Sequence, residues 1–189
     1  TGKHDSAIYY AEAAADIYRQ RKDGQRLAEA NILKARACYK AARYQEALGI
    51  TQANLPTIKQ LGDSLLLFRA WRRIGSCYYR LGRRTEALPL LQQAGALADR
   101  LSQNDFVRND VDAMQEMRLT LYDLFKAEGD LRNALRYHEA YTRVQDSLLT
   151  TRQKHHEALL LMRFDAQQKD NHIRALEREA ALGKRANRL

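Results

Sequence analysis

Proline is nearly absent from this 189-residue chain, which contains only Pro56 and Pro89. Proline breaks or kinks helices, so its scarcity leaves room for long uninterrupted helices. Ala, Leu, Arg, Gln and Glu dominate the remainder, and all of them are good helix formers. Hydrophobic residues make up 45% of the chain and charged residues 29%, which excludes a disordered segment. We therefore expect an all-α protein.

Cysteine is equally scarce, since the chain has only Cys38 and Cys77. Two cysteines without C-x-x-C spacing are too few for a disulfide scaffold. Both fall on apolar faces of expected helices, so we expect buried free thiols.

Long apolar runs are missing as well. The longest is "ALLLM" at 158–162, far short of the ~20 residues that span a bilayer. The first residues given do not have the pattern of a signal peptide, which says little about a longer parent protein. The chain opens on "TGKHDSA" without Met, so we expect a fragment of a longer protein, with more repeats before Thr1.

Catalytic motifs are also lacking. The five histidines fall in no metal-binding pattern, and there is no Walker sequence, G-x-S-x-G or glycine-rich phosphate loop. We expect no enzymatic activity from this chain, no metal and no cofactor. The net charge of +9 suits nucleic acid, a membrane surface or an acidic ligand, although a solvated arginine-rich surface is the default interpretation.

What the chain does contain is an internal repeat. Three segments align without gaps: "ARACYKAARYQEAL" at 35–48, "GSCYYRLGRRTEAL" at 75–88 and "YDLFKAEGDLRNAL" at 122–135. A partial copy starts the chain. The anchoring alanines are separated by 40, 40 and 47 residues, and the polar stretch 102–110 accounts for the longer last spacing; they are Ala7, Ala47, Ala87 and Ala134.

Each copy predicts a helical hairpin. The first helix carries a small residue where its neighbour crosses closely, such as Ala35 or Gly75. The turn follows, with Gly82 and Gly129 available for a left-handed helix end and Ala42 in the equivalent place of the first full copy. The alanine of the second helix allows the two helices to pack tightly.

This skeleton, clearest in "GSCYYRLGRRTEA" at 75–87, resembles the tetratricopeptide repeat (TPR). The resemblance implies a TPR-like right-handed α-solenoid over 1–150, with repeats at about 23–62, 63–102 and 109–149 after a partial first repeat. A long C-terminal helix is expected over 151–189. The expected helices cover 5–21, 26–42, 44–61, 64–81, 84–101, 110–128, 131–149 and 151–182.

In a TPR solenoid the first helices line a concave groove, which would bind a peptide or protein partner. The candidate ligand-binding residues at groove positions are Arg36, Tyr39, Lys40, Arg69, Arg72, Arg73, Ser76, Tyr79, Arg80 and Asp123. Arg69, Arg73, Ser76 and Arg80 share one helix face, so a carboxylate-bearing peptide is the expected ligand class. The alternative is that these arginines pair with Asp and Glu of adjacent repeats.

Some chaperone-binding TPR domains hold a C-terminal carboxylate with two basic groove residues of one repeat. Arg69 and Arg73 look like that pair. Leu33 stands where the preceding repeat of such a clamp carries Asn, so the full clamp is absent.

The last forty residues have heptad spacing instead of the repeat skeleton. We expect the helix to cap the last repeat with its first half, to pair with a second copy as a coiled coil, or both. The candidate dimer contacts are Leu159, Met162, Ala166, Ile173 and Leu176.

A narrower resemblance rests on two elements in order, "QDSL" at 145–148 and the K-x-x-x-I-x-x-L-E-x-E pattern of 169–179. Together they are similar to the membrane-proximal end of Bacteroidetes-type TPR sensors. That implies the periplasmic sensor region of a membrane-anchored two-component histidine kinase, or of a related helix-turn-helix transcriptional regulator. A cytoplasmic TPR scaffold is the alternative. Nucleic-acid binding ranks last, and no nucleic-acid partner is expected.

Overall fold

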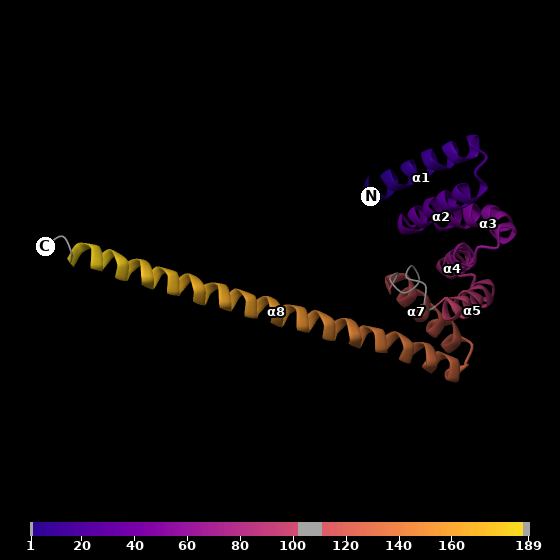
Figure 1. Ribbon diagram of the computed structural model, residues 1–189. Helices are drawn as coiled ribbons and strands as arrows, with labels where there is room; N and C mark the ends of the chain where they lie inside the picture. The colour runs from indigo at the N-terminus through magenta and orange to yellow at the C-terminus, as the bar shows by residue number, and fades with distance from the viewer. Residues whose placement is uncertain (1, 102–110, 187–189) are drawn as a thin grey trace. The chain divides into compact units, whose positions relative to one another are not determined.

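The computed structural model describes residues 2–101 and 111–186, and within these ranges the chain forms helices joined by short turns (Figure 1). Side chains are described for 4–101, 111–146, 156–164, 166, 167 and 169. The helices are α1 (Gly2–Gln20), α2 (Gly24–Lys40), α3 (Tyr44–Leu61), α4 (Ser64–Arg80), α5 (Arg84–Arg100), α7 (Val111–Ala127) and α8 (Leu131–Ala186).

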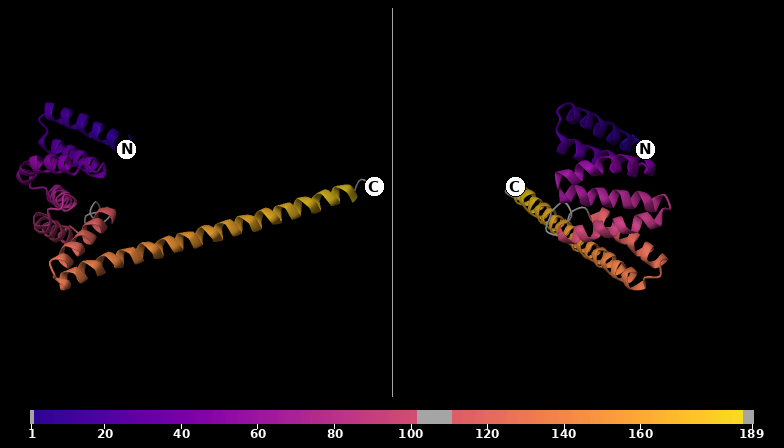
Figure 2. Two further views of the ribbon diagram at one scale, coloured as in Figure 1. Left: turned by 180° about the vertical axis from the view of Figure 1, so that it is seen from behind. Right: turned by 90° about the vertical axis from the view of Figure 1, so that its right-hand side faces the viewer.

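The chain divides into two compact units, Thr1–Tyr141 and Thr142–Leu189. In the first unit each helix packs against the next along the chain, α1 on α2 through α4 on α5, and α5 packs on α7. The first helices of the three hairpins also form a row of their own, because α4 contacts both α2 and α7 (Figures 1 and 2). This is the expected TPR-like right-handed α-solenoid, and the expected fold class is confirmed.

The core of the first unit lies where the hairpin helices meet. Of the four anchoring alanines, Ala47, Ala87 and Ala134 are buried, whereas Ala7 of the partial first copy is exposed. Phe68, Leu91, Leu121 and other large apolar side chains fill the space around the buried ones. The helices α4 and α5 approach each other closely at Gly75, since a Cβ built on it would lie 2.6 Å from Cγ of Leu91. The small residues that the repeat predicts therefore set the spacing of the helices.

The turns inside the hairpins share one left-handed residue. Gly82 and Gly129 have φ of 77° and 79°, as their repeat position predicts, and Ala42 takes the same conformation with φ of 60°. In each case the next backbone N–H reaches back to the helix. Arg43 N–H donates to Cys38 O at 2.9 Å, and Arg83 N–H donates to Tyr78 O at 2.8 Å.

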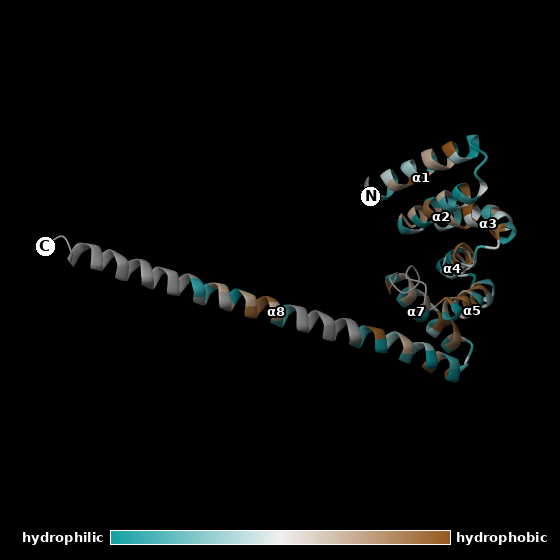
Figure 3. Cartoon of the chain, viewed as in Figure 1, coloured by the Kyte–Doolittle hydropathy of each residue, from teal (hydrophilic) through white to brown (hydrophobic). Residues whose placement is uncertain are grey.

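The two helices expected at 131–149 and 151–182 are one helix, α8, of 56 residues. The expected break is wrong because the sequence supplies nothing to make it: residues 131–182 contain neither Gly nor Pro. At 1.5 Å per residue α8 is about 84 Å long. Figure 3 shows an apolar stretch in its described middle part.

The described helices contain no 18-residue window apolar enough, and poor enough in charge, to qualify as a membrane span.

Candidate functional site

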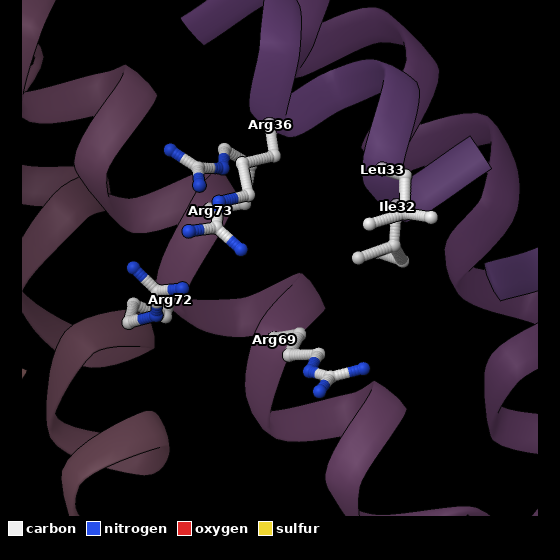
Figure 4. Close-up of a pocket in the computed structure, with 6 residues that line it drawn as sticks. All are labelled: Ile32, Leu33, Arg36, Arg69, Arg72 and Arg73. Atoms are coloured by element: carbon white, nitrogen blue, oxygen red, sulfur yellow. The ribbon is translucent and has the colours of Figure 1, made fainter. Parts of the chain in front are cut away.

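The row of first helices holds a small pocket between α2 and α4, which we call the arginine pocket. Its volume is about 70 Å³. It is lined by Ile32, Leu33 and Arg36 of α2 and by Arg69, Arg72 and Arg73 of α4 (Figure 4). Four of the ten candidate ligand-binding residues therefore lie around one cavity.

The members of the pocket differ in exposure. Arg72 and Arg73 are only 4% and 5% exposed, whereas Arg36 is exposed and Arg69 is half-buried. Arg72 and Arg73 are candidate groove residues, yet both are buried where α4 packs against α2 and α7.

None of the described residues that line the arginine pocket carries a carboxylate. The ion pairs between described residues involve neither Arg36 nor Arg73. Burial is the main cause that lowers the pKa of Arg73; Cys77, Tyr39 and Glu116 oppose it, and the positive charge of Arg36 adds a smaller lowering effect. An arginine nevertheless remains protonated, so the pocket concentrates positive charge.

The guanidinium of Arg73 rests on an aromatic ring. Its Cζ lies 4.3 Å from the centre of the Tyr39 ring, a cation–π contact between α4 and α2. In Figure 4 the side chains of Arg36, Arg73 and Arg72 follow one another along one side of the pocket. The stacking fixes Arg73 while its N–H groups stay at the cavity.

Tyr39 is in turn held by two further residues. Its hydroxyl donates a hydrogen bond to Glu116 of α7, and Nε of Arg80 donates to the same hydroxyl at 3.3 Å. Arg80 also lies 3.6 Å from Oε1 of Glu116. Burial, with the Glu116 hydrogen bond, raises the pKa of Tyr39 to about 12, so the phenol stays neutral.

The sequence left open whether the groove arginines pair with Asp and Glu of adjacent repeats, and the structure gives a different result for each residue. Arg80 does pair with an acid of the next repeat. Tyr79 hydrogen-bonds Asp123 at 3.0 Å, which joins two more of the candidates. Ser76 is buried, and Lys40 is exposed at the end of α2. Whether any of the ten contacts a ligand stays a prediction.

One connection was not anticipated from the sequence. Gln115, a buried residue next to Glu116, donates a hydrogen bond from Nε2 to the backbone oxygen of Tyr141 at 3.1 Å. Tyr141 belongs to α8 and is the last residue of the first unit. The only sequence signal was a polar residue on the inner face of α7.

The candidate dimer contacts are partly described. Leu159, Met162 and Ala166 are exposed on α8. The side chains of Ile173 and Leu176 lie outside the described residues. Leu160, Leu161 and Phe164 are exposed beside the heptad positions.

Among the residues with described side chains, no group of three or more His, Cys, Asp and Glu could hold a metal ion.

Comparisons with known proteins place the fold. No protein-family model matches the chain, and no curated protein sequence matches it significantly. Several solved structures do. The chain is similar to a Rap protein complexed with competence and sporulation factor, with 22% identity, a TM-score of 0.57 and coverage of 72% of this chain and 36% of that one.

Two further solved structures are also similar to the chain. The apo form of RapI matches with 19% identity, a TM-score of 0.63 and coverage of 77% of this chain and 50% of that one. The TPR domain of Arabidopsis FLU matches with 17% identity, a TM-score of 0.54 and coverage of 66% and 98%. The chain thus spans between about a third and a half of the Rap structures, and what it shares with all three is the TPR-like helical-repeat fold.

Proposed function

We propose that this chain is a non-catalytic protein-interaction module that binds a peptide or protein along the row formed by α2, α4 and α7. The observation that carries the proposal is the arginine pocket, whose described lining residues include four arginines and no carboxylate. Arg73 is only 5% exposed, and no ion pair between described residues involves it. Enclosed positive charge of this kind is costly unless a partner compensates it. An anionic group of the partner would supply that compensation through charge-assisted hydrogen bonds.

The similar Rap protein was solved in complex with competence and sporulation factor, which is consistent with a binding role for a fold of this kind. For the present chain we propose a signal-input role, as the periplasmic sensor region of a membrane-anchored two-component histidine kinase. The supporting observations are the two sequence elements at 145–148 and 169–179 and the continuity of α8.

Binding near Arg73 would be transmitted through contacts that the structure contains. Arg73 rests on Tyr39, Tyr39 hydrogen-bonds Glu116, and the neighbouring Gln115 hydrogen-bonds the Tyr141 backbone of α8. A ligand that favours one arrangement of this chain of contacts would bias α8. A cytoplasmic scaffold, or the input domain of a helix-turn-helix regulator, would use the same binding surface with a different output.

The test is selection of peptides from a random library on the immobilised chain, followed by affinity measurement of the selected peptides. Lys40→Glu and Arg80→Glu place negative charge on the row of first helices at exposed positions. We expect each to weaken binding at least tenfold, whereas Arg100→Glu on α5 leaves it unchanged. If no peptide is selected, or if all three variants bind like wild type, the proposed binding surface is wrong.

A further inference from the structure

The chemical class of the ligand in the arginine pocket can be specified more closely than an anionic group. This inference rests on the proposed function. We propose that the pocket receives a phosphate monoester in its dianionic form, rather than the carboxylate that the TPR resemblance implies.

Charge is the first reason. Arg36 and Arg73 both line the pocket and are permanently charged, and neither takes part in an ion pair between described residues. A carboxylate brings one negative charge and two oxygens. A phosphate monoester brings about −1.5 to −2 and three strong acceptor oxygens at neutral pH, so it can accept hydrogen bonds from more than one guanidinium at a time.

The size and surroundings of the pocket are the second reason. The pocket is small, with a volume of about 70 Å³, which suits a compact anionic group. Leu33 lies at the cavity and is 55% exposed, and Ile32 beside it is buried. The apolar residue offers a contact for the carbon chain that carries the phosphate.

The preorganisation of Arg73 is the third reason. Arg73 is held on the Tyr39 ring, and Tyr39 is fixed by Glu116 and Arg80 before any ligand arrives. A fixed guanidinium loses little conformational entropy on binding, which favours affinity. Arg36, on the exposed side, completes the cavity from the facing helix.

The affinity for a phosphate monoester should depend on pH in a range where the affinity for a carboxylate would not. The second pKa of a phosphate monoester is about 6, so most of the dianion is lost by pH 5. Among the described residues, the titratable and charged groups around Arg73 are Arg36, Arg69, Arg72, Tyr39, Cys77, Arg80 and Glu116, none of which is a histidine. Glu116 is engaged by Tyr39 and Arg80.

The test is isothermal titration calorimetry of the 189-residue chain with three probes: inorganic phosphate, a short peptide with one phosphoserine, and the same peptide with Glu in that place. We expect the phosphopeptide to bind at pH 7.5 at least tenfold more tightly than the Glu peptide. Its affinity should fall about tenfold between pH 7.5 and 5.0 because the dianion is protonated. Inorganic phosphate should bind more weakly than the phosphopeptide, since it lacks the contact with Leu33.

Two variants localise the binding. Arg36→Gln combined with Arg69→Gln should lower phosphopeptide affinity at least tenfold. Leu33→Glu should do the same by repulsion while leaving the core untouched, so it covers the case in which the arginine variant misfolds. Arg100→Gln on α5 is the matched control and should bind like wild type.

Equal affinities for the phosphoserine and Glu peptides, or no binding by any probe, would overturn the phosphate assignment. If inorganic phosphate bound as tightly as the phosphoserine peptide, the assignment of a phosphate monoester as the ligand would be wrong. A library-selected peptide that binds the Arg36→Gln/Arg69→Gln variant as well as wild type would overturn the pocket as its site. That last result would leave the proposed binding along α2, α4 and α7 standing, so the two proposals fail separately.

Discussion

Ala42 occupies a backbone conformation that its side chain opposes. Its φ of 60° is in the left-handed region, where a Cβ crowds the following carbonyl oxygen at a cost of roughly 1–2 kcal/mol. The turn of the second full repeat has Gly82 at the equivalent position, with φ of 77°. The two positions therefore form a natural pair for measuring this strain.

We predict that Ala42→Gly raises the free energy of unfolding by about 1 kcal/mol, since glycine adopts the left-handed conformation without steric cost. Gly82→Ala should lower it by a similar amount, because a Cβ there meets nothing within 4 Å and only the backbone strain remains. Urea unfolding followed by circular dichroism measures both. A destabilising effect of Ala42→Gly would contradict the explanation.

The thiols of Cys38 and Cys77 are free and fully buried, as their helix positions predicted. Burial raises their pKa values from 9.0, to about 11 for Cys38 and to about 12 for Cys77, and nearby Glu46 adds to the effect on Cys38. The folded protein thus keeps both protons at a pH where the unfolded chain releases them.

The burial of the two thiols has consequences for their reactivity and for the pH dependence of stability. At pH 8 we expect neither thiol to react with a thiol-specific reagent until denaturant unfolds the chain. Stability is fully present below pH 9 and should fall as pH rises through 11 to 12, because there the unfolded state loses protons that the folded state retains. The Cys38→Ala/Cys77→Ala variant should show a shallower decline; an identical decline would assign it to other groups, such as Tyr39.

At the scale of elements, the spacing of α4 and α5 depends on the absence of a side chain at Gly75. A Cβ there would lie 2.6 Å and 2.8 Å from Cγ and Cδ2 of Leu91, which is itself fully buried. Such a contact forces the side chain or the helices to move.

We predict that Gly75→Ala destabilises the protein by about 1–2 kcal/mol, the overpacking cost less the better helix propensity of alanine. Gly49→Ala in α3 is the control. That glycine is exposed and has nothing within 4 Å of a built Cβ, so its replacement should stabilise by about 0.5–1 kcal/mol. Thermal unfolding of the two variants compares them directly, and equal shifts would show that α4 and α5 are not in tight contact.

At the scale of the whole molecule, α8 belongs to both compact units and carries exposed Leu159 and Met162 on its heptad positions. Apolar residues at heptad spacing on an exposed helix indicate pairing with another helix. We propose that the partner is a second copy of the chain.

Met162→Cys should form a disulfide-linked dimer under mild oxidation in the full-length protein. Glu157→Cys should not, because position 157 is exposed but lies away from the heptad positions. Non-reducing electrophoresis distinguishes the two, and the buried native thiols should not interfere. No crosslink at 162 in the presence or absence of ligand, or equal crosslinking at both positions, would argue against the paired helix.

The sequence by itself determined the hairpins and their small contacts. Gly82, Gly129 and the buried alanines act through backbone conformation and volume and recur at equivalent places of the repeat, so alignment of the copies is enough to predict them. The helix ends of the first five helices follow from the same local chemistry. The break in α8 was predicted wrongly because the end of a repeat pattern is not itself a helix-ending signal.

Only the tertiary structure decided the site. Whether Arg72 and Arg73 are open or enclosed depends on how α2 and α7 pack against α4, which no local pattern encodes. The hydrogen bond between Tyr39 and Glu116 joins residues 77 positions apart, so it depends on the stacking of two successive repeats. Local interactions act within a few residues of chain, whereas the electrostatics of the arginine pocket is a sum over side chains that only the folded solenoid brings together.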